Sequence, residues 1–150
     1  MLTPTGPKVL EYNVRFGDPE TQTMAMLIAN EDFAELLLAC TQERLCHVPV
    51  RTNPGYACNV VISSAGYPWS SSSGDVITLA LPEASGKGAV QVFHAGTKET
   101  ADGTLVTAGG RVFSVAAAAD TLPEAVAAAY EGVKSVQFSG MYCRPDIAYR

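Results

Sequence analysis

The chain has 150 residues, of which 47% are hydrophobic and 17% are charged, and its formal net charge at pH 7 is −5. This length allows one domain or two small lobes with a hydrophobic core, and the composition is typical of a globular protein. The acidic balance without a basic run argues against a nucleic-acid partner, and no apolar run is long enough for a membrane span or a secretion signal.

The cysteines show no C-x-x-C spacing; they are Cys40, Cys46, Cys58 and Cys143. They could form two disulfide bonds in a secreted protein, but without a secretion signal we expect reduced thiols and a cytoplasmic location. Neither histidine stands at metal-ligand spacing from a cysteine, so we expect no zinc site.

Residues 1–7 predict a turn, and the segment 10–16 that follows predicts a β-strand because apolar and polar residues alternate along it. The apolar face would carry Leu10, Tyr12, Val14 and Phe16, and the polar face would carry Glu11, Asn13 and Arg15. Glu11 and Asn13 offer two oxygens of the kind that Mg²⁺ shares with substrate phosphates. Arg15 could bind a phosphate or carboxylate with both ends of its guanidinium group. The alternative is an ordinary antiparallel strand with a solvated polar face.

Gly17 ends this predicted strand, and the next three residues predict the start of a helix. Asp18 is a suitable N-cap, and Pro19 suits the first helical position. Glu20 would place a negative charge in the first turn, where the helix dipole favours it. Capping accounts for Asp18 and Pro19 but not for the polar strand face beside them.

Residues 11–22 read Glu-Tyr-Asn-Val-Arg-Phe-Gly-Asp-Pro-Glu-Thr-Gln and resemble the signature of the phosphoribosylamine–glycine ligase (glycinamide ribonucleotide synthetase) family, ATP-grasp enzymes of purine biosynthesis. The resemblance implies that Glu11 and Asn13 bind Mg²⁺ or Mn²⁺ that bridges the phosphates of ATP. It implies that Arg15 lies at the reaction centre, and that Asp18 and Glu20 help to hold substrate.

The next elements are helical, and a turn-rich linker follows them. Apolar spacing predicts helices over 21–29 and 32–45, and the prolines and glycine of 48–55 predict a linker. We therefore place a domain boundary between 1–50 and 51–150.

Beyond the linker the pattern changes to short strands and one helix. A capping box at Thr121–Glu124 with a proline in the first turn opens that helix, whose apolar face includes Ala129 and Val133. Strands are predicted over 56–63, 75–79, 89–94, 104–107 and 111–117, with a hairpin turn at 101–103.

Blocks of the same family recur in order through this half: Ala65–Pro68, Phe93–Thr97, Thr107–Val112 and Asp146-Ile147. The family usually has glycine at the position of Ala65, and a tyrosine and a lysine where Ser70–Ser73 stand. The residues themselves suggest a structural role for His94, and a turn or bulge rather than an anion site for Gly109-Gly110-Arg111.

The resemblance implies an α+β fold, in which 1–50 form the C-terminal part of an ATP-grasp module and 51–150 a small antiparallel β-rich domain with one packed helix. It implies that the complete enzyme joins phosphoribosylamine to glycine, splits ATP to ADP and phosphate, and passes through a glycyl phosphate. The chain would then be the C-terminal portion of that enzyme, inactive alone and prone to self-association through its exposed ATP-grasp face. The alternative is a non-catalytic binding or assembly module that retains the fold.

Overall fold

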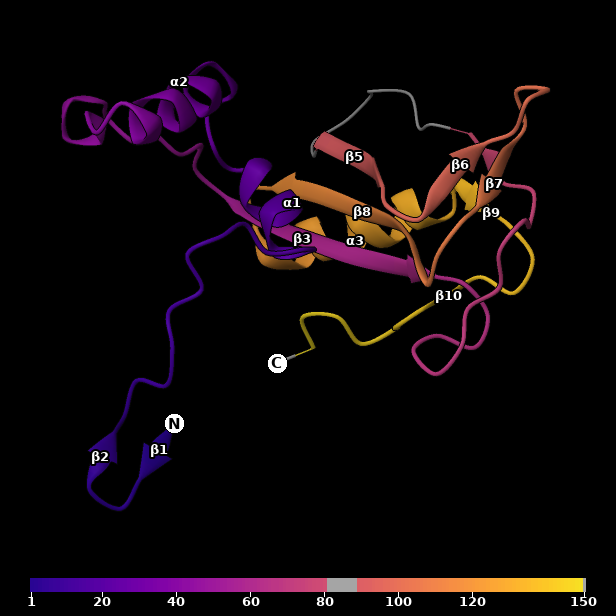
Figure 1. Cartoon of the computed structure of the whole chain (residues 1–150), viewed down its shortest axis with the longest axis horizontal. Coiled ribbons are helices and arrows are strands. Elements are labelled where there is room, and N and C mark those ends of the chain that lie inside the picture. The colour runs from indigo at the N-terminus through magenta and orange to yellow at the C-terminus, as the bar shows by residue number, and fades with distance from the viewer. Residues whose placement is uncertain (81–88, 150) are drawn as a thin grey trace.

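The computed structural model describes residues 1–80 and 89–149, and its centre is a four-stranded antiparallel sheet (Figure 1). The strands lie in the order β10–β3–β8–β5, with bounds Tyr142–Cys143, Tyr56–Ser63, Arg111–Ala119 and Ala89–His94. β3 and β5 have the predicted bounds, and β8 runs two residues past its predicted end. β8 pairs with β3 on one side and β5 on the other, and Val112–Ala117 are all buried.

Helix α3 (Leu122–Val133) covers one face of this sheet (Figure 1). The predicted cap is confirmed, because the Thr121 hydroxyl accepts a hydrogen bond from the Glu124 amide and donates one to the Glu124 carboxylate. The helix approaches the sheet closely at Gly132, where a Cβ would lie 2.6 Å from Val90 Cγ1 and 2.8 Å from Val115 Cγ1. The core between them includes Cys58, Val60, Ile62, Phe113, Val115, Ala117, Ala125, Ala129 and Val133.

Two pairs of short strands extend this region: β6 (Thr97–Glu99) with β7 (Leu105–Thr107), and β4 (Thr78–Leu79) with β9 (Val136–Gln137). The predicted hairpin turn at 101–103 connects β6 to β7. Only the end of the predicted strand 75–79 forms a ladder, although Val76 makes an isolated bridge to Val106. The antiparallel β-rich architecture with one packed helix is therefore confirmed.

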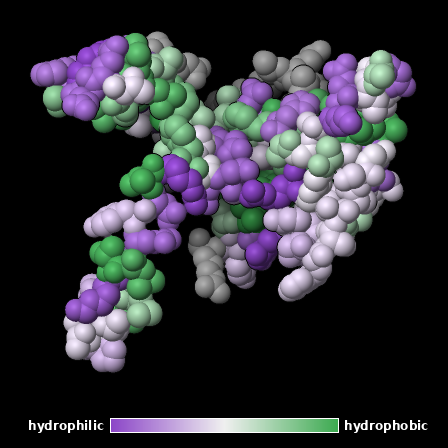
Figure 2. Space-filling model, in the orientation of Figure 1, coloured by the Kyte–Doolittle hydropathy of each residue, from purple (hydrophilic) through white to green (hydrophobic). Residues whose placement is uncertain are grey.

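The first sixteen residues, which we call the N-terminal arm, project from the rest of the chain (Figure 1). β1 (Leu2–Thr3) and β2 (Gly6–Pro7) form a small hairpin, and no regular element follows until α1. The strand predicted over 10–16 is therefore wrong for the described residues. A strand needs neighbouring N–H and C=O groups, and within residues 1–80 and 89–149 no strand pairs with this segment. Figure 2 shows hydrophobic side chains on the surface of the arm, where Val14 is 93% exposed.

The helices between the arm and the sheet differ in their bounds from the prediction. They are α1 (Glu20–Ala25), α2 (Asn30–Thr41) and the 3₁₀ turn η1 (Leu45–His47). Asp18 does not cap α1, because Pro19 occupies the N-cap position and the Asp18 carboxylate is used elsewhere. α2 ends early because Glu43 has a φ of 54°, in the left-handed region that terminates helices.

Helix α1 lies on the face of the sheet opposite α3 (Figure 1). The linker 48–55 returns past the end of α1. There the backbone N–H of Asn53 donates to the Leu27 carbonyl at 2.6 Å, and Ile28 forms an isolated β-bridge with Thr52. All four cysteines are free. Among the residues that the structure describes, none of the helices has both the length and the apolar character needed to cross a bilayer.

Candidate functional site

The predicted metal ligands lie beside each other on the N-terminal arm. The Asn13 amide nitrogen donates to Glu11 Oε1 at 3.2 Å, and both side chains are exposed. Arg15 is also exposed and donates to the Phe16 carbonyl at 3.4 Å. The structure thus brings Glu11 and Asn13 together and places Arg15 two residues further along the same arm, nearer to the sheet domain.

Asp18 is held by two residues through its carboxylate. Arg111 Nη2 contacts Asp18 Oδ2 at 3.1 Å, and the amide nitrogen of Gln22 donates to Asp18 Oδ1 at 3.1 Å. Arg111 also donates from Nη1 to the Asp18 backbone carbonyl at 2.7 Å. Sequence reasoning singled out the Gly-Gly-Arg motif but missed this contact, since the two residues stand 93 positions apart.

Close backbone packing sets the position of Arg111 at the start of β8. A Cβ on Gly96 would lie 2.7 Å from the Arg111 carbonyl oxygen and 2.9 Å from the Gly109 Cα. A Cβ on Gly110 would lie 2.4 Å from the ring of Tyr67. A side chain at Gly96 or Gly110 would collide with these neighbours. The two glycines therefore allow two loops and the Tyr67 ring to pack closely at the start of β8, where Arg111 stands.

A second contact joins the turn after the arm to the sheet. The Asn59 amide nitrogen on β3 donates to the Pro19 carbonyl at 3.0 Å. Ser114 on β8 donates to Asn59 Oδ1, which fixes the orientation of the amide. Asn59 is a polar residue inside the otherwise apolar run 57–62, and that break in the pattern was the one sequence signal for this role.

Glu20 begins α1 with an exposed carboxylate in the first turn, where the helix dipole favours it. Its side chain folds back over Gly17, since a Cβ there would lie 2.3 Å from Glu20 Oε2. Glu20 and Asp18 therefore lie in the same turn, and within residues 1–80 and 89–149 it is the Asp18 carboxylate that accepts a hydrogen bond from the β-rich domain.

An apolar hollow of about 460 Å³ lies beside this turn. Phe16 and Phe33 meet edge to face in its wall with ring centroids 6.1 Å apart, and Phe93 contributes from β5. Gln22 also lines the hollow, and its Oε1 is buried and has no hydrogen-bond partner among the described residues. The end of the N-terminal arm is thus packed onto α2 through Phe16.

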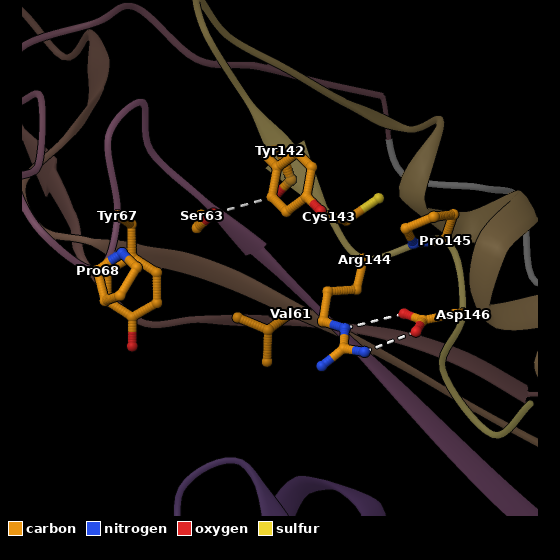
Figure 3. A pocket seen from close by; sticks show the side chains of 9 residues that line it. All are labelled: Val61, Ser63, Tyr67, Pro68, Tyr142, Cys143, Arg144, Pro145 and Asp146. Carbon is orange, nitrogen blue, oxygen red and sulfur yellow. Dashed lines mark hydrogen bonds and ion pairs between the residues drawn. The ribbon is translucent and has the colours of Figure 1, made fainter.

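A larger cleft of about 640 Å³ lies at the β10 edge of the sheet (Figure 3). Figure 3 shows Tyr67 and Pro68 on one side and a paired Arg144 and Asp146 on the other, with Val61 between them. Arg144 donates two hydrogen bonds to Asp146, at 2.8 and 2.6 Å, which lower the pKa of the Asp146 carboxyl and raise that of the Arg144 guanidinium. Because the two charges neutralise each other, this wall offers a ligand little net charge.

The histidine and cysteine positions have structural surroundings. The imidazole of His94 packs edge to face against Phe113 with ring centroids 4.8 Å apart, and its Nδ1 lies 3.0 Å from Thr97 Oγ1. Burial raises the pKa of the Cys58 thiol, which keeps it protonated and unreactive.

The described residues contain no group of three or more histidine, cysteine, aspartate or glutamate side chains that could hold a metal ion. A metal ion at Glu11 and Asn13 would therefore need further ligands besides these two side chains.

Comparison with known proteins identifies the family. The model of the phosphoribosylglycinamide synthetase C domain matches residues 57–150. A phosphoribosylamine–glycine ligase from a Nostoc species is 48% identical over 100% of this chain and 35% of its own length. A bifunctional purine biosynthetic protein from Schizosaccharomyces pombe is 48% identical over 99% of this chain and 18% of its own length.

The fold comparison agrees with the sequence comparison. The crystal structure of phosphoribosylamine–glycine ligase from Thermotoga maritima matches with a TM-score of 0.75 and 38% identity, over 99% of this chain and 35% of that one. The chain thus spans about a third of the length of these ligases. Since the family model covers more than half of the residues and the other matches cover nearly all of them, the chain belongs to the phosphoribosylglycinamide synthetase family and contains its C domain.

Proposed function

We propose that the chain supplies the C domain and the metal-binding segment of a ligase that joins phosphoribosylamine to glycine while splitting ATP to ADP and phosphate. One observation carries this proposal. The match to the Thermotoga maritima ligase covers 99% of the chain, so it includes the arm with Glu11 and Asn13 as well as the β-rich domain. On this proposal residues 1–50 are the end of an ATP-grasp module, although by themselves they form only a hairpin and helices.

The side chains of Glu11 and Asn13 fit a magnesium or manganese ion by their chemistry. They are exposed, they already touch, and they offer hard oxygen donors; two such donors leave room for ATP phosphates and water in the coordination shell. The amide of Asn13 must turn its oxygen toward the ion, which requires only rotation about one side-chain bond. When bound, the ion would neutralise charge on the phosphates of ATP.

Arg15 on the arm, and Asp18 and Glu20 in the turn that follows it, would contact the substrates directly. Arg15 carries a fixed positive charge and two parallel donors, which suit a phosphate or a developing acyl phosphate. Glu20 has an exposed carboxylate in the same region and would contact the amino group of a substrate. Asp18 would be a weaker contact, because both of its carboxylate oxygens already accept hydrogen bonds.

The decisive experiment replaces the matching part of the Nostoc ligase with these 150 residues and measures glycinamide ribonucleotide formation from phosphoribosylamine, glycine and MgATP. The chimaera should be active. The 150 residues alone should give no product above a heat-killed control, since they span 35% of that ligase.

Substitutions in the chimaera test the roles on the arm. Glu11→Gln should lower kcat/KM by roughly a hundredfold, or about 3 kcal/mol of transition-state stabilisation, because a charge that helps to hold the metal is lost. Asn13→Ala should lower it less, since a neutral ligand is lost. Tyr12→Phe is the matched control and should leave kcat/KM nearly unchanged.

Two outcomes would count against this assignment. If Tyr12→Phe abolished turnover while Glu11→Gln did not, the metal role would be wrong. A folded chimaera that made no product would favour the alternative, a non-catalytic binding or assembly module.

A further inference from the structure

We propose that Arg111 is a positioning residue, which anchors the Asp18 turn to the β-rich domain and so determines where Glu11, Asn13 and Arg15 are presented. The inference rests on the proposed function, because it concerns the same metal-binding arm. It assigns Arg111 a task that the sequence did not reveal. In this role Asp18 is first a partner of Arg111, which accounts for its weaker contact with substrate.

The geometry of the contact is specific to arginine. One guanidinium group reaches both the backbone carbonyl of Asp18, at 2.7 Å, and its carboxylate, at 3.1 Å. The two donors come from different nitrogens of a planar fork, and a lysine ammonium on the same stem could not match both acceptors in this way. Because the bond to the carbonyl fixes the backbone itself, it restrains the path of the chain into the arm.

The turn that Arg111 holds is closed on itself. The amide and hydroxyl of Thr21 both donate to the Gly17 carbonyl, at 3.1 and 2.6 Å. The Asn59 bond to the Pro19 carbonyl adds a second attachment to the sheet. The turn and the start of α1 are therefore attached to both β8 and β3, and Arg15 stands three residues before Asp18 in the sequence.

The contact is exposed enough that its loss should leave the fold intact. The side chain of Arg111 is 38% exposed and that of Asp18 is 54% exposed, and ion pairs in such places contribute little to folding stability. The buried part of β8 begins at Val112, beyond the arginine. A substitution at Arg111 therefore tests how the Asp18 turn is positioned and not whether the β-rich domain folds.

The first measurement is amide hydrogen exchange on the 150-residue chain. Arg111→Met should speed exchange in residues 17–25 by several-fold to about tenfold, as expected for the loss of two charge-assisted hydrogen bonds. Exchange in β3 and β8 should not change. Arg111→Lys should fall between wild type and Arg111→Met, and the matched control Arg51→Met, at an exposed arginine of the linker, should behave as wild type. Unchanged exchange in 17–25 would overturn the proposal.

The second measurement uses electron paramagnetic resonance to detect Mn²⁺ binding to the chimaera in the presence of a non-hydrolysable ATP analogue. Arg111→Met should weaken Mn²⁺ binding by about tenfold, and the Mg²⁺ concentration for half-maximal activity should rise in parallel. Saturating Mg²⁺ should restore most of kcat. Arg111→Lys should again be intermediate.

The outcomes separate this proposal from the proposed function. If exchange changes but Mn²⁺ affinity does not, Arg111 does not position the metal ligands and the inference is wrong. If the unsubstituted chimaera binds no Mn²⁺, the metal site and this inference fail together. If it binds Mn²⁺ but makes no product, the proposed function fails alone, and the Arg111 variants still report on the positioning of the metal ligands.

Discussion

The β-rich domain and the N-terminal arm have similar sequence patterns and opposite surroundings. Every second position is apolar both in β3, at Cys58, Val60 and Ile62, and in the segment 10–16, from Leu10 to Phe16. Val60 in β3 is fully buried between neighbouring strands and α3, whereas Val14 in the arm is 93% exposed. The difference shows that alternation determines which residues share a face but does not provide the partner that buries it.

This contrast also separates two tasks within the proposed site. The arm carries the side chains that would bind the metal and substrates, and the domain supplies the rigid attachment through Arg111 and Asn59. Reactive side chains on an exposed segment need such an attachment, because their geometry must be reproducible when substrate arrives.

The largest expected effect compares one buried and one exposed aromatic residue. Phe113 in β8 is fully buried, and Tyr12 in the arm is 82% exposed. Phe113→Ala should lower the free energy of unfolding by about 3–5 kcal/mol, since it removes apolar contacts and leaves a cavity. Tyr12→Ala should change it by less than about 0.5 kcal/mol.

Urea unfolding of the 150-residue chain, followed by circular dichroism, measures both values. Similar losses for the two variants would mean that the arm packs on the domain in solution, and the comparison between the two regions would then fail.

The second prediction concerns the apolar surface of the arm, where Leu10, Tyr12 and Val14 are all more than 70% exposed. An unpaired segment with such side chains favours association with another copy. Light scattering should therefore show an apparent mass that rises with protein concentration. The double variant Tyr12→Lys with Val14→Lys should remain a monomer, whereas the matched variant Lys98→Glu, on the exposed β6 strand, should associate as wild type. A wild-type chain that stays monomeric at high concentration contradicts this prediction.

The elements that could be predicted from sequence are those whose signals are local. The bounds of β3 and β5 follow from runs of apolar and β-branched residues, and the start of α3 follows from a capping box. These elements also find their partners within the chain, so local preference and tertiary packing agree.

The predictions that failed depend on contacts between distant parts of the sequence. The strand over 10–16 required a neighbour that the described residues do not supply, and Asp18 was expected to cap α1 because Arg111 could not be foreseen as its partner. Of the candidate site, the sequence could indicate the side chains of the arm. It could not indicate Arg111 and Asn59, the domain residues that hold the arm. A glycine-rich turn and an asparagine in a strand occur for many other structural reasons.

The smallest expected effect compares the arm with the other exposed end of the chain, the turn 144–147. The Tyr130 hydroxyl donates to the Arg144 carbonyl and accepts from the backbone N–H of Ile147, so this turn is attached to α3 while the arm is not.

Within this turn, hydrogen bonds from Arg144 lower the pKa of the Asp146 carboxyl below its ordinary value of 3.8. A carboxyl with a lowered pKa in the folded state stabilises that state above the unfolded pKa, and the contribution is lost as the pH falls through the folded value. Asp146→Asn should therefore lower the urea midpoint slightly at pH 7, and the difference from wild type should shrink as the pH falls below about 4 and vanish below the lowered pKa of the folded state. Asp120→Asn, at another exposed carboxylate, measures the effect of losing one negative charge without this pair. A difference between Asp146→Asn and wild type that persisted unchanged in acid would show that the ion pair does not stabilise the turn.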